Sequence, residues 1–262
     1  MFKRNVKLSK GECLLSNKKG RLSGRGQNSR GIRPRKCTYN SVPGVFSNED
    51  AFSERSYWDR RYNLEKNTFE WYKGYRGLKP LLLKYLKPDQ PLLQVGVGTS
   101  TIQLDLVNLS GFEDITNLDY SSVCIDHMRS LHMMVPELKY LQGDVRKMTA
   151  FEDGCFGGVL DKGTLDALLC GDCADDDSCK MLCEVSRVLQ PGGVYMMVTS
   201  QAPQGRYRYL SDPAYGWKVS VYEVGQILEM DGPYSLNTDK DLAHLGLPTM
   251  PYSHFVYVCL KI

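Results

Sequence analysis

A glycine pair followed at a set distance by a carboxylate marks the part of the chain best suited to bind a nucleoside. The apolar run 92–95 ends at Gly96, a second glycine stands at Gly98, and the next predicted strand ends at Asp119. Glycines permit a tight turn and close approach of a ligand to the backbone, and the helix start that follows offers free N–H groups. An acid about 20 residues further on accepts hydrogen bonds from ribose hydroxyls.

A second carboxylate follows at the end of the third predicted strand. This strand runs into Gly143-Asp144-Val145, and Tyr120 stands directly after Asp119. Asp144 suits an adenine amino group, which donates hydrogen bonds, and Tyr120 suits the flat adenine face. Each acid alone could instead cap a helix, above all Asp119, which precedes two serines. Together they predict an adenosine-containing cofactor at the carboxyl edge of a sheet.

The elements that must position these residues alternate between apolar runs typical of strands and runs with helical spacing. We expect strands at residues 92–95, 114–118, 138–142, 157–160 and 194–199, and helices at 77–86, 99–109, 121–134 and 178–189. Strands separated by helices imply right-handed crossovers and a parallel sheet. Residues 217–224 and 254–260 resemble two further strands joined by a polar loop. The sequence therefore predicts an α/β fold with a seven-stranded, Rossmann-like, mostly parallel sheet and an antiparallel C-terminal edge hairpin.

The first residues differ in composition from the rest of the chain. Residues 1–36 hold twelve Lys and Arg against one acid, and subtracting this charge of +11 from the chain's +3 leaves about −8 for the remainder. So little apolar surface predicts a disordered basic tail at 1–45, with an organelle transit segment as the alternative. From Phe46 onward the aromatic and charged composition predicts a single folded domain at 46–262.

Charge and cysteine content exclude several classes of protein. A body this acidic is repelled by phosphate backbones, so we expect no nucleic-acid binding by the folded part. The chain has no apolar run of the roughly 18 residues that a membrane span needs. Nine cysteines without a signal peptide favour a reducing compartment, so we expect the cytoplasm, or an organelle if the tail is a transit peptide. The CxxC and CxxxC spacings at 170–183 lie too close together for a typical zinc site, and we expect no metal.

The segment Asp161–Leu168, which reads DKGTLDAL, makes a resemblance specific. Together with five other segments it is similar to the class I S-adenosylmethionine-dependent methyltransferases, within the methyltransferase-like group that includes the elongation factor 1-alpha lysine methyltransferases. The other matching segments are 57–62, 69–72, 118–123, 143–146 and 184–193. They follow the family's order and cover residues 57–200.

The resemblance implies S-adenosylmethionine as cofactor and gives single residues a role. Gly96 and Gly98 would let the methionine part approach the backbone, Asp119 would bind the ribose, and Asp144 would accept from the adenine amino group. The remaining implied contacts are Tyr120 and Val145 on the two faces of the adenine, Lys162 at the cofactor, and Trp58, Tyr62 and Trp71 in an aromatic cap above it. Without the resemblance, packing within the cap explains the same aromatic residues.

The glycine turn departs from the family's pattern. The usual motif resembles Gly-Cys-Gly-Asn-Ser, whereas this chain has Gly96-Val97-Gly98-Thr99-Ser100. Thr99 keeps a hydroxyl but cannot supply both the donor and the acceptor of an amide. A non-catalytic adaptor that keeps the fold and binds cofactor weakly therefore stays open as an alternative.

The implied reaction is methyl transfer to a protein lysine, with elongation factor 1-alpha as an expected partner. The lysine amine must lose its proton before it attacks, so we place the carboxylates of Asp161 and Asp166 beside the acceptor, to orient the amine or receive the proton. Asp166 could equally cap a helix. Residues 201–216 and 229–252 are expected to be acceptor loops, and a small-molecule acceptor is the alternative.

Overall fold

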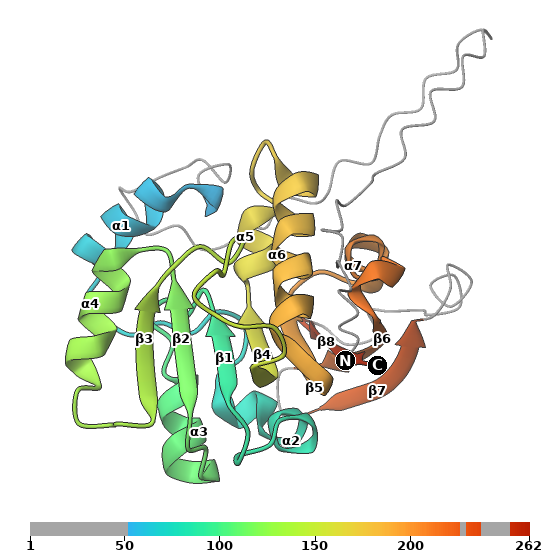
Figure 1. Ribbon diagram of the computed structural model, residues 1–262, viewed down its shortest axis with the longest axis horizontal. Coiled ribbons are helices and arrows are strands. Elements are labelled where there is room, and N and C mark those ends of the chain that lie inside the picture. Colours follow the sequence, from blue (N-terminus) through green and yellow to red (C-terminus); the bar gives the residue numbers. More distant parts are fainter. Residues whose placement is uncertain (1–51, 226–228, 237–251) are drawn as a thin grey trace, which may run out of the picture. The chain divides into compact units, whose positions relative to one another are not determined.

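A mixed sheet with parallel strands on one side and antiparallel strands on the other forms the centre of the protein (Figure 1). The computed structural model describes residues 52–225, 229–236 and 252–262, all of which fall within the compact unit Lys36–Ile262. The described strands are β1 (Leu92–Val95), β2 (Ile115–Asp119), β3 (Leu138–Gln142), β4 (Phe156–Lys162), β5 (Leu189–Thr199), β6 (Trp217–Val224), β7 (Met230–Leu236) and β8 (His254–Lys261). Their order is β3-β2-β1-β4-β5-β8-β6-β7, and β1 to β5 pair in parallel.

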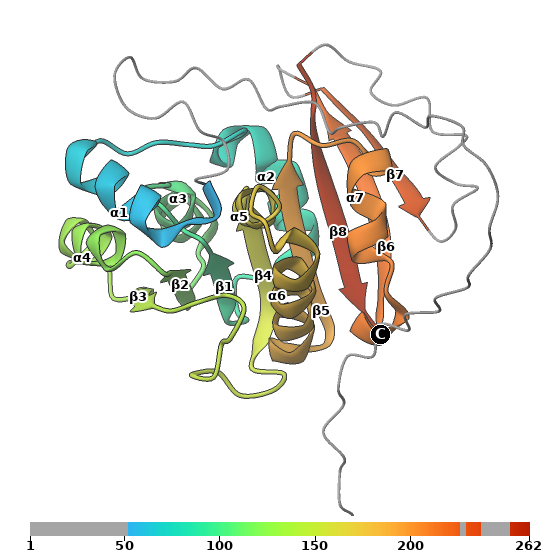
Figure 2. The same cartoon turned by 90° about the horizontal axis from the view of Figure 1, so that it is seen from above.

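Helices cover both faces of this sheet (Figure 2). They are α1 (Arg55–Leu64), α2 (Tyr75–Tyr85), α3 (Ile102–Ser110), α4 (Ser122–Leu131), α5 (Thr164–Leu168), α6 (Ala174–Val188) and α7 (Pro203–Leu210). One apolar cluster joins α2, α3 and α4 to one face, and a second joins α5, α6 and α7 to the other. The two faces arise because right-handed crossovers that move in opposite directions along a sheet place their helices on opposite sides.

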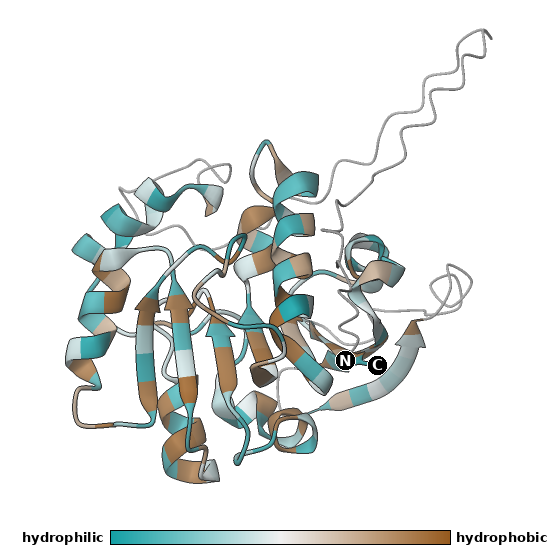
Figure 3. Ribbon diagram, viewed as in Figure 1, coloured by the Kyte–Doolittle hydropathy of each residue, from teal (hydrophilic) through white to brown (hydrophobic). Residues whose placement is uncertain are grey.

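Apolar strand residues explain the burial of the parallel part (Figure 3). All four residues of β1 and all seven of β4 are buried, as expected for strands covered by helices on both faces. Helix ends are also encoded locally: the Ser121 hydroxyl accepts from Cys124 N at 3.2 Å, and Gly111 ends α3 in the left-handed conformation. The α/β class and the mostly parallel sheet are confirmed.

The C-terminal half corrects three sequence expectations. The sheet has eight strands instead of seven, because the expected acceptor loop 229–252 contains β7, which pairs with β6. The expected loop 201–216 contains α7. Helix α6 begins at Ala174, before the expected residue 178, since its first turn contains three aspartates that favour the positive helix N-terminus.

Strand β8 runs antiparallel to β5 and β6, so its first residues lie at the edge of the sheet where the parallel strands end. Thr199 at the end of β5 pairs with Phe255, and Val224 at the end of β6 pairs with His254. The strand order reverses between β1 and β4, which defines a crevice at this carboxyl edge. The site must therefore be sought between the ends of these strands.

The structure does not describe the N-terminal residues on which part of the domain prediction rests. Residues 1–51 lie outside the described ranges, so the basic tail at 1–45 and the boundary at residue 46 stay predictions. Among the described helices, none combines the length and apolar character that crossing a membrane requires.

Candidate cofactor and acceptor site

Helix α1 lies beside the carboxyl ends of β2 and β3 (Figure 1) and contributes Trp58 and Tyr62 to an aromatic cluster. Trp58 stacks on Tyr62 with ring centroids 5.7 Å apart, and Trp71 meets Trp58 edge-on at 6.2 Å. The guanidinium of Arg61 lies 5.7 Å from the Trp58 ring and 5.4 Å from the Trp71 ring. The three aromatic residues expected in the cap therefore lie together, and their contacts with a cofactor stay a prediction.

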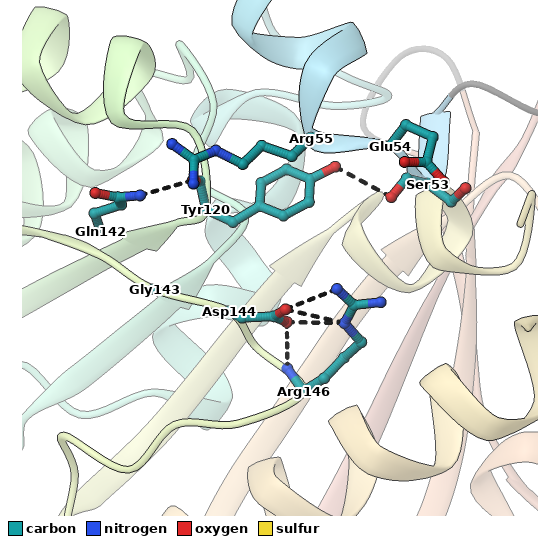
Figure 4. Close-up of a pocket in the computed structure, with 8 residues that line it drawn as sticks. All are labelled: Ser53, Glu54, Arg55, Tyr120, Gln142, Gly143, Asp144 and Arg146. Carbon is teal, nitrogen blue, oxygen red and sulfur yellow. Dashed lines mark hydrogen bonds and ion pairs between the residues drawn. The ribbon is translucent and has the colours of Figure 1, made fainter.

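A pocket of about 280 Å³ opens at the ends of β2 and β3 (Figure 4). Its lining residues are Ser53, Glu54, Arg55, Tyr120, Gln142, Gly143, Asp144 and Arg146. The Tyr120 hydroxyl donates to Ser53 O at 3.4 Å, and Gln142 Nε2 donates to Tyr120 O at 3.3 Å. Val145 packs in the apolar core and is not among these lining residues, and its expected contact with the adenine stays a prediction.

Asp119 lies at the end of β2 and is 5 % exposed. One carboxylate oxygen accepts from Gly98 N at 3.0 Å, and the other accepts from Ser121 N at 2.9 Å. Burial raises the pKa of Asp119 to about 6, although these backbone donors oppose the shift. Because each carboxylate oxygen can accept a second hydrogen bond, Asp119 keeps capacity for two ribose hydroxyls.

Asp144 is held by an arginine that the sequence analysis did not consider. Both of its oxygens accept from the Arg146 side chain, the shortest contact being 2.7 Å to Nη2, and Arg146 also pairs with Asp177. Burial alone would raise the pKa of Asp144, but the hydrogen bonds and charge of Arg146 outweigh it and lower this pKa. The adenine contact expected of Asp144 stays a prediction, since an adenine amino group must share the carboxylate with Arg146.

The two glycines of the turn make room for side chains of the protein itself. A Cβ on Gly96 would lie 2.1 Å from the Thr164 hydroxyl, and one on Gly98 would lie 2.9 Å from the Tyr62 hydroxyl. Both glycines have positive φ values, of 56° and 53°, which favour glycine. Gly96 and Gly98, which the resemblance assigns to the approach of the methionine part, are therefore also required by packing within the protein.

The covering segment, which consists of the five residues Phe69–Lys73, crosses the crevice. At its start, Phe69 N donates to Thr99 O at 3.1 Å. The Glu70 carboxylate then accepts from Ser100 Oγ at 2.9 Å and from Thr101 N at 2.5 Å. The N-terminus of α3, where the sequence suggested a place for a ligand anion, is therefore occupied by an acid of the chain itself.

Lys162 lies at the end of β4 beneath the covering segment. Its Nζ pairs with the Glu70 carboxylate at 2.7 Å and donates to Trp71 O at 3.2 Å, and only 4 % of its side chain is exposed. Burial lowers the pKa of Lys162, while the charge of Glu70 opposes the shift. Glu70 and Lys162 thus present one charge of each sign beside the glycine turn.

Asp161 lies near the end of β4 and contacts the start of α5. Its side chain is fully buried and accepts from Thr164 N at 2.8 Å, Leu165 N at 3.2 Å and the Tyr195 hydroxyl at 2.8 Å. Burial raises its pKa to about 6. These three donors show that Asp161 holds the start of α5 against β4, and its expected contact with the acceptor stays a prediction.

Asp166 lies at the carboxyl edge as expected, and its oxygens are shared among three side chains. One oxygen accepts from the Tyr72 hydroxyl at 2.5 Å, and the other from Thr199 Oγ1 at 2.8 Å and from the Arg206 guanidinium. This network joins the covering segment to β5 and α7. The expected proton transfer to Asp166 stays a prediction.

The site fits an adenosine-containing cofactor with a zwitterionic tail. The pocket offers an aromatic ring beside a carboxylate, Asp119 has unused acceptor capacity toward the ribose, and the ion pair of Glu70 and Lys162 matches an ammonium and a carboxylate by charge. Within the described ranges, no cluster of His, Cys, Asp and Glu side chains suits a metal ion.

Sequence reasoning missed Glu70, Tyr72, Arg146 and Arg206 as residues that build the site. Glu70 and Tyr72 stand in a segment that resembles the family, yet their partners lie 30 to 94 positions away. Of these four residues, only Arg146 has a local sequence signal: it stands two positions after Asp144, a spacing that suits an ion pair within a turn.

Comparisons with known proteins agree with this geometry. A family model described as "Methyltransferase domain" matches residues 93–197. The EEF1A lysine methyltransferase 4 of Bos taurus is 36% identical over 188 residues, which cover 68% of this chain and 73% of that protein. The eEF1A lysine and N-terminal methyltransferase of Homo sapiens is 36% identical over 198 residues, covering 71% of this chain but 28% of that longer protein.

Solved structures support the fold alone. A methyltransferase solved with the Haloferax volcanii Trm112 methyltransferase activator has a TM-score of 0.54 at 14% identity, covering 79% of this chain and 96% of that chain. A protein from echinomycin biosynthesis, linked to conversion of a disulfide bond into a thioacetal group, has a TM-score of 0.55 at 14% identity, covering 79% and 93%. With its fold, its carboxylate at the end of β2 and its close relatives, the chain belongs to the class I S-adenosylmethionine-dependent methyltransferases, in the group of the EEF1A lysine methyltransferases.

Proposed function

We propose that this enzyme transfers a methyl group from S-adenosylmethionine to the side-chain amine of a lysine in a protein. The observation that carries the proposal is the identity of 36% to EEF1A lysine methyltransferase 4 over 188 residues, which cover 68% of this chain and 73% of that protein. Elongation factor 1-alpha is the proposed substrate, because the relatives are named for it. We also propose a cytoplasmic location, where free cysteines stay reduced.

The residues of the chain supply binding and orientation. When bound, the cofactor supplies an electrophilic methyl group on a positively charged sulfur. Asp119 would hold the ribose, Tyr120 the adenine face, and Glu70 with Lys162 the charged tail. This binding fixes the methyl group in line with an incoming amine, and such positioning accounts for most of what methyl transfer needs.

The covering segment and the aromatic cluster restrict water at the same place. A lysine amine has an ordinary pKa of about 10.4, so its protonated form dominates at neutral pH. Desolvation beneath Trp71 and Tyr72 favours the neutral amine, whose lone pair can attack. After transfer the nitrogen carries the positive charge and releases a proton to solvent.

Purified elongation factor 1-alpha offers the direct test of this proposal. We expect incubation with the enzyme and S-adenosylmethionine to add multiples of one methyl mass, located on a lysine by peptide mass spectrometry. An Asp119→Ala variant should abolish most of the shift. Methylation of a small molecule with no mass shift on any protein would support the alternative and contradict the proposal.

A further inference from the structure

Tyr72 and His254 meet at the carboxyl edge on the far side of the crevice from the adenine pocket. Their ring centroids lie 5.2 Å apart at an interplanar angle of 50°. Tyr72 belongs to the covering segment, and His254 is the first residue of β8. The two rings are 182 positions apart in sequence, so the antiparallel course of β8 alone brings them together.

This side of the crevice is the one left for an acceptor. The adenine pocket and Asp119 lie at the ends of β2 and β3, whereas Tyr72 lies over the end of β4: a Cβ on Gly163 would come within 3.3 Å of the Tyr72 ring. The switch of strand order lies between β1 and β4. A ligand that reaches across this switch point from Asp119 therefore points its reactive end toward β4, β5 and the start of β8.

Tyr72 is held in an unusual backbone conformation. Its φ is 60°, in the left-handed region that a bulky side chain rarely adopts. The hydrogen bond of 2.5 Å from its hydroxyl to Asp166 fixes the ring, and Arg206 and Thr199 fix Asp166 in turn. A strained backbone conformation that several surrounding contacts hold in place is typical of functional sites, where it fixes the position of one side chain.

His254 carries a hydrogen-bonding atom that its surroundings leave unused. Its Nδ1 is buried and has no hydrogen-bond partner among the residues that the structure describes. Burial, with the charge of Lys73, lowers the pKa of His254 to about 4, so the ring is neutral at pH 7. In a neutral imidazole one nitrogen accepts, and leaving a buried acceptor without a donor costs free energy that a ligand can recover.

We propose that His254 Nδ1 accepts a hydrogen bond from the N–H of the acceptor amine, while the fixed Tyr72 ring forms the wall along which the acceptor side chain enters. This inference rests on the proposed function. The hydrogen bond removes rotation of the amine about its C–N bond and so directs the lone pair at the methyl group. His254 does not take the proton; it orients the nitrogen that is to be methylated.

Two variants whose side chains have the same branched shape separate this role from packing. The Asn and Leu side chains share the same branched skeleton of four heavy atoms, and both remove the imidazole ring, but only His254→Asn keeps a hydrogen-bonding atom near the position of Nδ1. We expect His254→Leu to lower kcat/KM for the protein acceptor by roughly tenfold relative to His254→Asn, the loss expected for one hydrogen bond. Both variants should bind S-adenosylhomocysteine with the wild-type Kd, which also shows that they fold.

A third variant tests the wall. Tyr72→Phe keeps the ring but loses the hydrogen bond to Asp166, so we expect KM for the protein acceptor to rise while the cofactor Kd is unchanged. Equal kcat/KM values for His254→Asn and His254→Leu, at unchanged cofactor affinity, would overturn the inference and leave the proposed function intact. Absence of protein methylation by the wild-type enzyme would overturn both.

Discussion

The carboxylate of Glu70 lies 2.7 Å from Nζ of Lys162, and this ion pair fastens the covering segment to the end of the central strand β4. Glu70 also accepts from the backbone N–H of Thr101, the residue directly before α3. One acid thus joins the three parts that surround the crevice: the segment above it, the strand below it and the helix beside it.

Replacing Glu70 with glutamine should loosen the site. Glu70→Gln leaves the buried ammonium of Lys162 without its counter-charge, so we expect the free energy of unfolding to fall by roughly 1–3 kcal/mol and the cofactor Kd to rise. Urea unfolding and calorimetry measure the two effects. The exposed Glu113→Gln is the matched control. If Glu70→Gln combined with Lys162→Met costs the sum of the single changes, the two residues are not coupled.

Asp119 should control cofactor affinity. Asp119→Ala removes the acceptors assigned to the ribose, and we expect the Kd for S-adenosylhomocysteine to rise by roughly fivefold to a hundredfold, with Asp119→Asn in between. Asp114→Ala, just before the start of the same strand β2, serves as the control, because Asp114 pairs with Lys139 at the surface. Equal affinity of the Asp119 and Asp114 variants would refute the ribose contact.

Asp161 should give the stability of the protein a distinct pH dependence. Its pKa of about 6 in the folded state is above the ordinary value, so the folded protein keeps a proton that the unfolded chain has lost. The free energy of unfolding therefore decreases as pH rises from about 4 to about 6, by about 2 kcal/mol from this group. Asp119 adds a decrease of the same sign.

The Asp161→Asn variant isolates this contribution. We expect urea unfolding at pH 4 to 6 to show a shallower fall for Asp161→Asn than for wild type. The exposed Asp126→Asn should keep the wild-type slope. An Asp161→Asn slope equal to that of wild type would mean that folding does not raise the pKa of Asp161.

Gly96 should tolerate no side chain. In Gly96→Ala the new Cβ meets the Thr164 hydroxyl at 2.1 Å, so we expect a loss of roughly 3 kcal/mol in the free energy of unfolding. Gly192 also has a positive φ, of 77°, but a Cβ there meets no described atom within 4 Å. Gly192→Ala therefore measures the backbone cost alone, about 1 kcal/mol. Similar losses for both variants would show that Thr164 yields easily.

Much of the fold follows from local patterns, and the exceptions have physical reasons. Strands 138–142 and 217–224 were predicted with the observed bounds, because alternating or continuous apolar residues end at clear boundaries. Strand β7 was missed because Gly232 and Pro233 interrupt it; an edge strand with exposed residues tolerates both. Helix α7 was missed because its polar residues carry little periodic signal.

The positions of site residues could be predicted from sequence where a residue directly follows the end of a strand. Asp119 and Asp144 lie at the ends of neighbouring strands, as their positions after apolar runs indicated. The contacts of Asp161 with the start of α5 were not predicted, because sequence cannot tell whether a carboxylate at the end of a buried strand faces the crevice or turns back to the next helix. His254 was not predicted, since its neighbourhood depends on the antiparallel return of β8.

The central claim is that this chain methylates a protein lysine. The most direct test incubates the full-length enzyme with a cell lysate and S-adenosylmethionine carrying a labelled methyl group, with Asp119→Ala in parallel. We predict a labelled protein band that is lost with Asp119→Ala and that yields methyl-lysine on hydrolysis. Label in small molecules alone, or no label with a wild-type enzyme that binds S-adenosylhomocysteine, would contradict the claim.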